Sequence, residues 1–173
     1  MRARSGFSSR AAIAVTKGVF AAAVVVAALA LPGSSSAQGA PAAGGADKDA
    51  LVAPEALAGI VRSSAKKPVI FQVGFRVLYE QAHIPQSRYV GPGSKEEGLA
   101  ELRRAASPLP RDTAIVLYCG CCPWVRCPNV QPAYKALLGL GFTNVKLLFI
   151  EKNFGADWVA KGYPVEKGAP AGD

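Results

Sequence analysis

The chain has 173 residues, half of them hydrophobic, and a formal net charge of +8 at pH 7. Four basic residues and no acidic ones lie in the first 17 positions, so the rest of the chain carries 16 basic and 12 acidic residues, or +4. This mild excess is spread along the sequence. It argues against nucleic-acid binding, which needs a basic patch or stripe.

The N-terminus has the composition of a secretory signal peptide. A basic leader is followed by an uninterrupted apolar run of 13 residues, 19–31, and then by small residues that include Ser35 and Ala37. A membrane-spanning helix needs about 20 apolar residues, and Lys17 interrupts any longer run. We therefore predict a signal peptide at 1–37, export to a periplasmic or extracellular location, and no stable membrane anchor after cleavage.

The remaining chain divides into three parts. Residues 38–52 are mainly Ala and Gly, with Pro41 and three charged residues at 47–49. Such a segment buries too little apolar surface to offset its ordering entropy, so we predict a disordered linker. Residues 53–168 are long enough for one domain with its own core. Residues 169–173 form a short tail.

Apolar patterning predicts helices and strands in alternation through the domain. Helical spacing marks 54–64, and a β-branched and aromatic run marks a strand at 69–73. Ser94 followed by Glu97 is a capping-box pattern that predicts a helix from Ser94 to about residue 106. The other expected elements are a helical turn at 75–81, strands at 87–90, 114–118 and 144–150, and helices at 130–140 and 153–161. Short connections between strands and helices favour an α/β domain with a mostly parallel sheet.

All four cysteines lie in residues 119–129, between a predicted strand and a predicted helix. Ligands bind beyond the carboxyl ends of parallel strands, and the free N–H groups of a first helical turn favour an anion. We expect a thiolate at Cys119 to be stabilised there by the helix dipole and by Arg126. Gly120 and Asn129 belong to the predicted pocket, and Trp124 either walls it or packs at the loop tip.

The roles of Cys121, Cys122 and Cys127 stay open. One of them can resolve Cys119 by forming a disulfide, or Cys121 and Cys127 can close the loop with a structural disulfide. The C-x-x-C from Cys119 to Cys122 also permits thiol–disulfide exchange in an exported protein. Zinc usually takes ligand pairs from separated knuckles, so a metal at these close thiols would be a soft ion such as Cu(I). We assign no metal and no cofactor.

His83 is the only histidine, so any Cys–His dyad must use it. We favour a structural hydrogen-bonding role for it in the turn before Pro85. A phosphate-binding loop is excluded because the glycines at 91 and 93 are not followed by the Lys-Ser or Lys-Thr pair that such a loop requires.

Four segments resemble, in order and spacing, the rhodanese family of sulfurtransferases. They are 82–85 (Ala-His-Ile-Pro), 115–119, 140–145 and 157–166. The resemblance spans residues 54–167 and implies a three-layer domain, with helices on both faces of the sheet. It also implies a two-step reaction. A small sulfur-containing anion such as thiosulfate gives its sulfane sulfur to Cys119, and a thiol acceptor, a protein thiol included, or another nucleophile removes it.

The loop departs from the family in length. Arg126 lies seven positions after Cys119, whereas counted from Cys121 the spacing is the usual one. We prefer Cys119 as the sulfur carrier because the strand end sets its register. Gln72 stands where the family usually has Asp, and Gln86 where it has Gly. The alternative function is a thiol–disulfide or copper- or zinc-binding module on the same fold.

Overall fold

The computed structural model describes residues 48–169. The predicted signal peptide, the linker up to residue 47 and the tail from residue 170 lie outside the described residues. No helix in the described part of the chain is both long and apolar enough to span a lipid bilayer.

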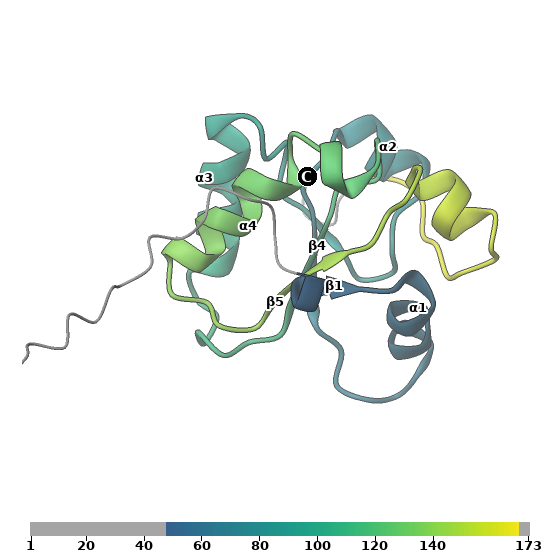
Figure 1. Ribbon diagram of the computed structural model, residues 1–173, viewed down its shortest axis with the longest axis horizontal. Coiled ribbons are helices and arrows are strands. Elements are labelled where there is room, and N and C mark those ends of the chain that lie inside the picture. Colours follow the sequence, from purple (N-terminus) through teal and green to yellow (C-terminus); the bar gives the residue numbers. More distant parts are fainter. Residues whose placement is uncertain (1–47, 170–173) are drawn as a thin grey trace, which may run out of the picture. The chain divides into compact units, whose positions relative to one another are not determined.

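A five-stranded sheet, parallel throughout, forms the centre of the domain (Figure 1). The strand order is β1-β5-β4-β2-β3, so β4 is the central strand. The strands are β1 (Leu51–Val52), β2 (Val69–Gln72), β3 (Arg88–Tyr89), β4 (Ile115–Tyr118) and β5 (Val145–Leu148). In register, Phe71 of β2 lies beside Leu117 of β4, which lies beside Leu147 of β5. The predicted α/β class with a parallel sheet is confirmed.

Helices cover both faces of this sheet. They are α1 (Pro54–Arg62), α2 (Arg76–Gln81), α3 (Glu96–Ala106) and α4 (Val130–Gly139), together with short 3-10 turns η1 (Lys48–Ala50) and η2 (Trp124–Arg126) and a π-helical turn η3 (Gly155–Val159). Buried residues of α3 and α4 share one core cluster, and those of α1 and η3 share another. The three-layer arrangement is therefore the predicted one.

The alternation of side chains along β4 divides the two cores. Ile115 and Leu117 point into the core under α3 and α4, whereas Val116 and Tyr118 point into the core under α1 and η3. Successive side chains of a strand face opposite sides of the sheet. Cys119, the next residue, continues the first series and is buried with Ile115 and Leu117.

Two local predictions differ from the structure. The linker was expected to run through residue 52, but residues 48–52 form η1 and β1, and β1 pairs with Leu147 and Leu148 of β5. A two-residue strand has too short a pattern to be recognised locally. Ser94 is not the cap of α3: Lys95 holds the N-cap position, without a side-chain cap hydrogen bond.

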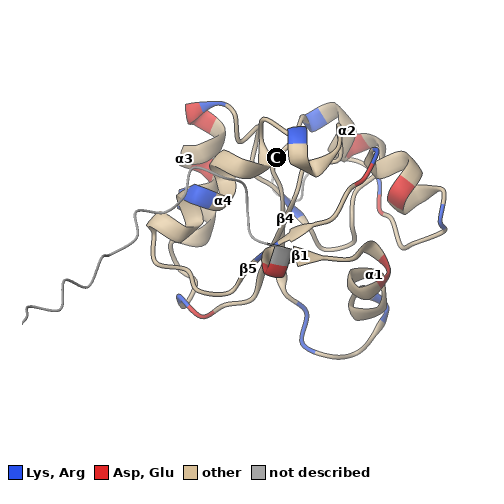
Figure 2. Ribbon diagram, in the orientation of Figure 1, with Lys and Arg blue, Asp and Glu red and all other residues tan. Residues whose placement is uncertain are grey.

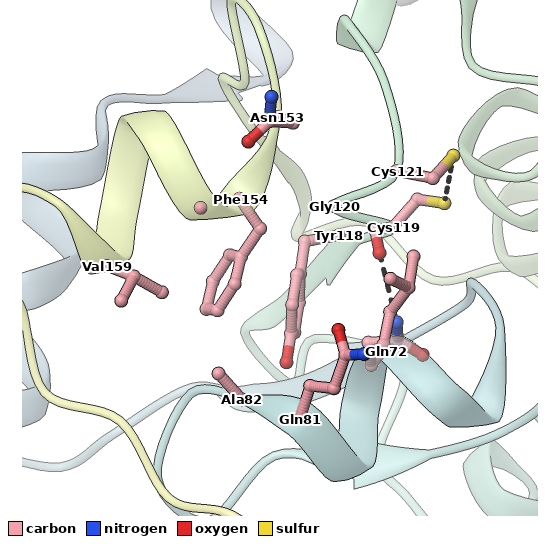
Figure 3. A pocket seen from close by; sticks show the side chains of 12 residues that line it. Gln72, Gln81, Ala82, Tyr118, Cys119, Gly120, Cys121, Asn153, Phe154 and Val159 are labelled. Carbon is pink, nitrogen blue, oxygen red and sulfur yellow. Dashed lines mark hydrogen bonds between the residues drawn. The ribbon is translucent and has the colours of Figure 1, made fainter.

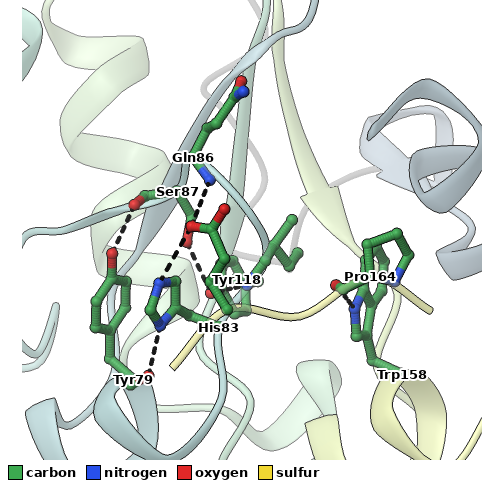
Figure 4. Close-up of polar contacts among 9 residues, drawn as sticks. Tyr79, His83, Gln86, Ser87, Tyr118, Trp158 and Pro164 are labelled. Carbon is green, nitrogen blue, oxygen red and sulfur yellow. Dashed lines mark hydrogen bonds and ion pairs between the residues drawn. The ribbon is translucent and has the colours of Figure 1, made fainter. Parts of the chain in front are cut away.

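Buried polar contacts attach the C-terminal segment to the domain (Figure 4). The indole N–H of Trp158, which is fully buried, donates to the Pro164 carbonyl at 2.8 Å. His83 stacks on Tyr79 with ring centroids 3.8 Å apart, and its Nδ1 lies 2.8 Å from the Tyr79 carbonyl oxygen. Because that oxygen only accepts, Nδ1 carries the proton. The backbone of His83 also pairs with Glu166, so this histidine has the structural role expected for it.

A substitution at Trp158 tests whether these contacts stabilise the domain. We expect Trp158→Ala to lower the free energy of unfolding by about 3–5 kcal/mol, because it removes a fully buried indole that stacks on Phe154. Urea denaturation measures the change. Leu138→Ala, at an exposed position of α4, is the control and is expected to change stability by less than about 0.5 kcal/mol. Equal effects of the two substitutions would contradict the assignment.

Candidate functional site

The cysteine loop, residues 119–129, begins where β4 reaches the C-terminal edge of the sheet. The chain turns sharply at Gly120, which has φ of +87°. A Cβ at Gly120 would lie 2.9 Å from the Cβ of Phe154, so both the conformation and the space require glycine. The loop then passes through η2 and enters α4 at Val130.

The loop brings the four sulfur atoms together. The Sγ of Cys119 lies 3.2 Å from that of Cys121, which lies 3.1 Å from that of Cys122. The Sγ atoms of Cys119, Cys121 and Cys127, here called the sulfur cluster, all lie within 4.8 Å of one another. None of the four cysteines is in a disulfide. Cys119 and Cys127 are buried, whereas Cys121 and Cys122 are half-buried.

Asn129 connects the sulfur cluster to the rest of the domain. Its side chain is fully buried, its Nδ2 donates to the Cys119 sulfur at 3.3 Å, and its Oδ1 accepts the Ser94 N–H at 3.0 Å. Asn129 holds the N-cap position of α4, as expected, but its side chain makes no cap hydrogen bond. The side chain is instead committed to Cys119 and Ser94.

Main-chain N–H groups at the start of α4 are directed at Cys127. Those of Asn129 and Val130 donate to the Cys127 sulfur, whereas Cys119 receives the N–H of Cys121. The pKa of Cys127 is lowered to about 6, first because the Cys119 thiol donates a hydrogen bond to it and then because of these N–H groups. The pKa of Cys119 is raised, first by the contact with Cys127 and then by burial. The direction of the two pKa shifts favours negative charge on Cys127 over Cys119.

The sequence predicts that Arg126 stabilises a thiolate, but the structure does not bring it to the cluster. Arg126 is exposed on η2, and among residues 48–169 its side chain has no hydrogen-bond or ion-pair partner. Lys and Arg are scattered over the domain rather than gathered at one place (Figure 2). Trp124 packs against the core that contains Cys119 and Cys127, and its ring centroid lies 6.4 Å from that of Phe149.

A cavity of about 430 Å³ opens beside the loop (Figure 3). Cys119, Gly120 and Cys121 line it together with Tyr118 and Phe154, and none of the twelve lining residues is charged. In Figure 3 the sulfur atoms of Cys119 and Cys121 point away from the Phe154 ring.

Two residues of this region were not among those expected at the site. The amide of Gln72 donates to the Cys119 carbonyl at 3.0 Å and accepts the Gly74 N–H at 3.1 Å, so it secures the backbone at the sulfur. The sequence did carry a signal for Gln72, because it stands where the rhodanese family usually has Asp. The sequence carried no such signal for Phe154, because only the tertiary structure brings it next to Gly120.

The pKa order of the thiols predicts a pH dependence. Because the pKa of Cys127 is lower in the folded than in the unfolded protein, its ionisation adds stability above the unfolded value of about 8.5, and this stability is lost as pH falls through about 6. Thiolate ultraviolet absorbance of the reduced protein should show one group titrating near pH 6. Cys127→Ser should remove that transition, and Cys122→Ser should keep it. A wild-type protein with no thiolate below about pH 8 would contradict the assignment.

No protein-family model matches the chain, and no curated protein matches it. Solved structures do. The rhodanese-like domain of the Anabaena sp. Alr3790 protein is 22% identical, with a TM-score of 0.51, over 68% of this chain and 79% of that one. The BH2092 protein from Bacillus halodurans is 21% identical, with a TM-score of 0.53, over 70% of this chain and 80% of that one.

A thiosulfate sulfurtransferase from Pseudomonas aeruginosa is also similar. It is 23% identical with a TM-score of 0.51, and the match covers 69% of this chain but 20% of the sulfurtransferase. At this level of identity the likeness concerns the fold. The neighbours thus agree with the resemblance seen in the sequence, and the chain folds as a rhodanese-like domain with a cysteine-rich loop at the carboxyl end of its central strand.

Proposed function

We propose that this domain is a sulfurtransferase that carries sulfane sulfur as a persulfide on Cys119. The position of Cys119 carries the proposal, because it is the first residue after the central strand of a rhodanese-like sheet. Its sulfur accepts hydrogen bonds from the Cys121 N–H and the Asn129 amide, both of which favour an anion. Burial also shields a persulfide from water and from bulky oxidants.

The first step loads sulfur from a small sulfur-containing anion such as thiosulfate. The Cys127 thiolate, in contact with the Cys119 thiol, takes its proton. The Cys119 thiolate then attacks the outer sulfur of the donor, the donor's S–S bond breaks, and sulfite leaves with the electron pair. The name of the Pseudomonas aeruginosa neighbour supports this class of donor.

The second step passes the sulfur to a thiol acceptor. The acceptor gives its proton to the persulfide and attacks the outer sulfur. The Cys119 thiolate leaves and recovers a proton from Cys127, which restores the resting state. The cavity lined by Cys119 and Cys121 has no charged residue. We propose that an uncharged acceptor, either a small molecule or a protein side chain, docks at its mouth and that its thiol reaches the Cys119 sulfur, which points away from the Phe154 ring (Figure 3).

Thiol–disulfide exchange is the second candidate, favoured by the short sulfur contacts of Cys121. Its Sγ lies 3.2 Å from that of Cys119 and 3.1 Å from that of Cys122. Formation of either disulfide would release two electrons to a substrate disulfide. Export, which the N-terminal sequence predicts, would place these thiols in an oxidising compartment.

Mass spectrometry after thiosulfate treatment separates the two functions. We expect the reduced protein to gain the mass of one sulfur atom, to lose this gain in Cys119→Ser and to keep it in Cys121→Ser and Cys122→Ser. A subsequent thiol acceptor should remove the added sulfur.

Two results would contradict the assignment. Sulfur uptake that depends on Cys121 and survives in Cys119→Ser would make Cys121 the carrier. Loss of two hydrogens without any sulfur gain would favour disulfide exchange.

A further inference from the structure

The sulfur cluster contains one thiol more than the transfer reaction uses. Cys119 and Cys127 suffice for nucleophile and base, yet Cys121 places a third sulfur 3.2 Å from Cys119. We propose that Cys119, Cys121 and Cys127 also form a binding site for one Cu(I) ion.

The spacing of the three sulfur atoms suits a single ion. A metal–sulfur bond of about 2.3 Å puts the sulfur atoms of a trigonal site about 4 Å apart. The observed separations run from 3.2 Å to no more than 4.8 Å and so bracket this value. Side-chain rotations within the loop can therefore equalise the three distances around an ion.

The chemistry of the site selects a soft ion. All three ligand atoms are sulfur, and no carboxylate or imidazole of residues 48–169 joins the group. Val130, Leu148 and Ile150 line the small recess beside Cys119 and Cys127, so the surroundings are apolar. Thiolates in such a site favour Cu(I), whereas structural zinc needs a fourth ligand.

Cys122 does not supply that fourth ligand in this arrangement. Its sulfur contacts Cys121 at 3.1 Å but lies outside the group of three. Three thiolates around one Cu(I) ion carry a net charge of −2, and a fourth buried thiolate would raise this to −3, so three ligands limit the buried charge.

The groups around the cluster hold the ligands in place without a metal. Asn129 donates its amide to Cys119, and the N–H groups of Asn129 and Val130 donate to Cys127. Such outer contacts orient ligands and offset the negative charge of thiolates. Binding of Cu(I) displaces thiol protons to solvent and leaves copper in the +1 state. Because it uses the Cys119 sulfur, it excludes the persulfide.

The test titrates the reduced full-length protein with Cu(I) alone, without oxygen, against a chromogenic Cu(I) chelator. We expect one Cu(I) per chain. Cys121→Ser and Cys127→Ser should each weaken binding by more than about tenfold, whereas Cys122→Ser, the matched control with the same number of thiols, should bind as the wild type does. Circular dichroism checks that each variant is folded, and X-ray absorption of the wild-type complex should show three sulfur neighbours.

Several results would overturn the site. They are no stoichiometric Cu(I) binding, equal weakening by Cys122→Ser, fewer than three sulfur neighbours, or tighter binding of Zn(II) than of Cu(I) when both are offered. The outcome is separate from that of the sulfur-transfer assay. Sulfur uptake in the metal-free protein reports on Cys119 as a carrier, and loss of that uptake after Cu(I) loading reports on the shared sulfur atom.

Discussion

The site depends on the close approach of Cys119 and Cys127, whose sulfur atoms lie within 4.8 Å of each other. This approach exists because the alternation of β4 points Cys119 into the core under α4, where the loop returns with Cys127. A negative charge on one of two buried sulfur atoms this close disfavours a second negative charge on the other. The lowered pKa is that of Cys127, first because of Cys119 and then because of the Asn129 and Val130 N–H groups.

In the proposed reaction two cysteines divide two roles: Cys127 holds the negative charge at rest, and Cys119 carries the sulfur. The thiolate rests at the start of α4, where N–H groups stabilise it. The thiol at the end of β4 lines the cavity, and its raised pKa keeps it protonated at rest; in the proposed reaction its neighbour takes the proton. The extra length of the loop makes this possible, because it carries a second buried cysteine to the beginning of the helix. Arg126, in the same lengthened loop, is exposed.

Asn129 links the start of α4 to the Cys119 sulfur by a hydrogen bond. Its amide reaches Cys119 and its carbonyl oxygen holds the backbone at Ser94, so the loop, α4 and the segment before α3 share one side chain. On the other side, Gln72 holds the Cys119 carbonyl and Gly74. Cys119 is therefore held from β2 through its carbonyl and from the start of α4 through its sulfur, which favours a preformed site over one assembled on binding.

Local patterns in the sequence were sufficient for the strands and helices that have a clear apolar period. The strand before Cys119 and the helix after Asn129 could be placed from residue types alone, and with them the position of the cysteine loop at the carboxyl edge of a parallel sheet. Which strands pair with each other could not be predicted from residue types. The strand at Leu51–Val52 has no pattern of its own and exists because β5 offers it free backbone groups.

Sequence by itself determined that four thiols would meet at the end of a strand, because they are close along the chain and a strand ends there. Only the tertiary structure decided which thiol has the lower pKa, which cysteines are buried, and that the Asn129 side chain binds the Cys119 sulfur. Those properties depend on burial and on hydrogen bonds from Asn129 and Val130 to the sulfur atoms, whose directions follow from the packing of α4 on the sheet rather than from the order of residues.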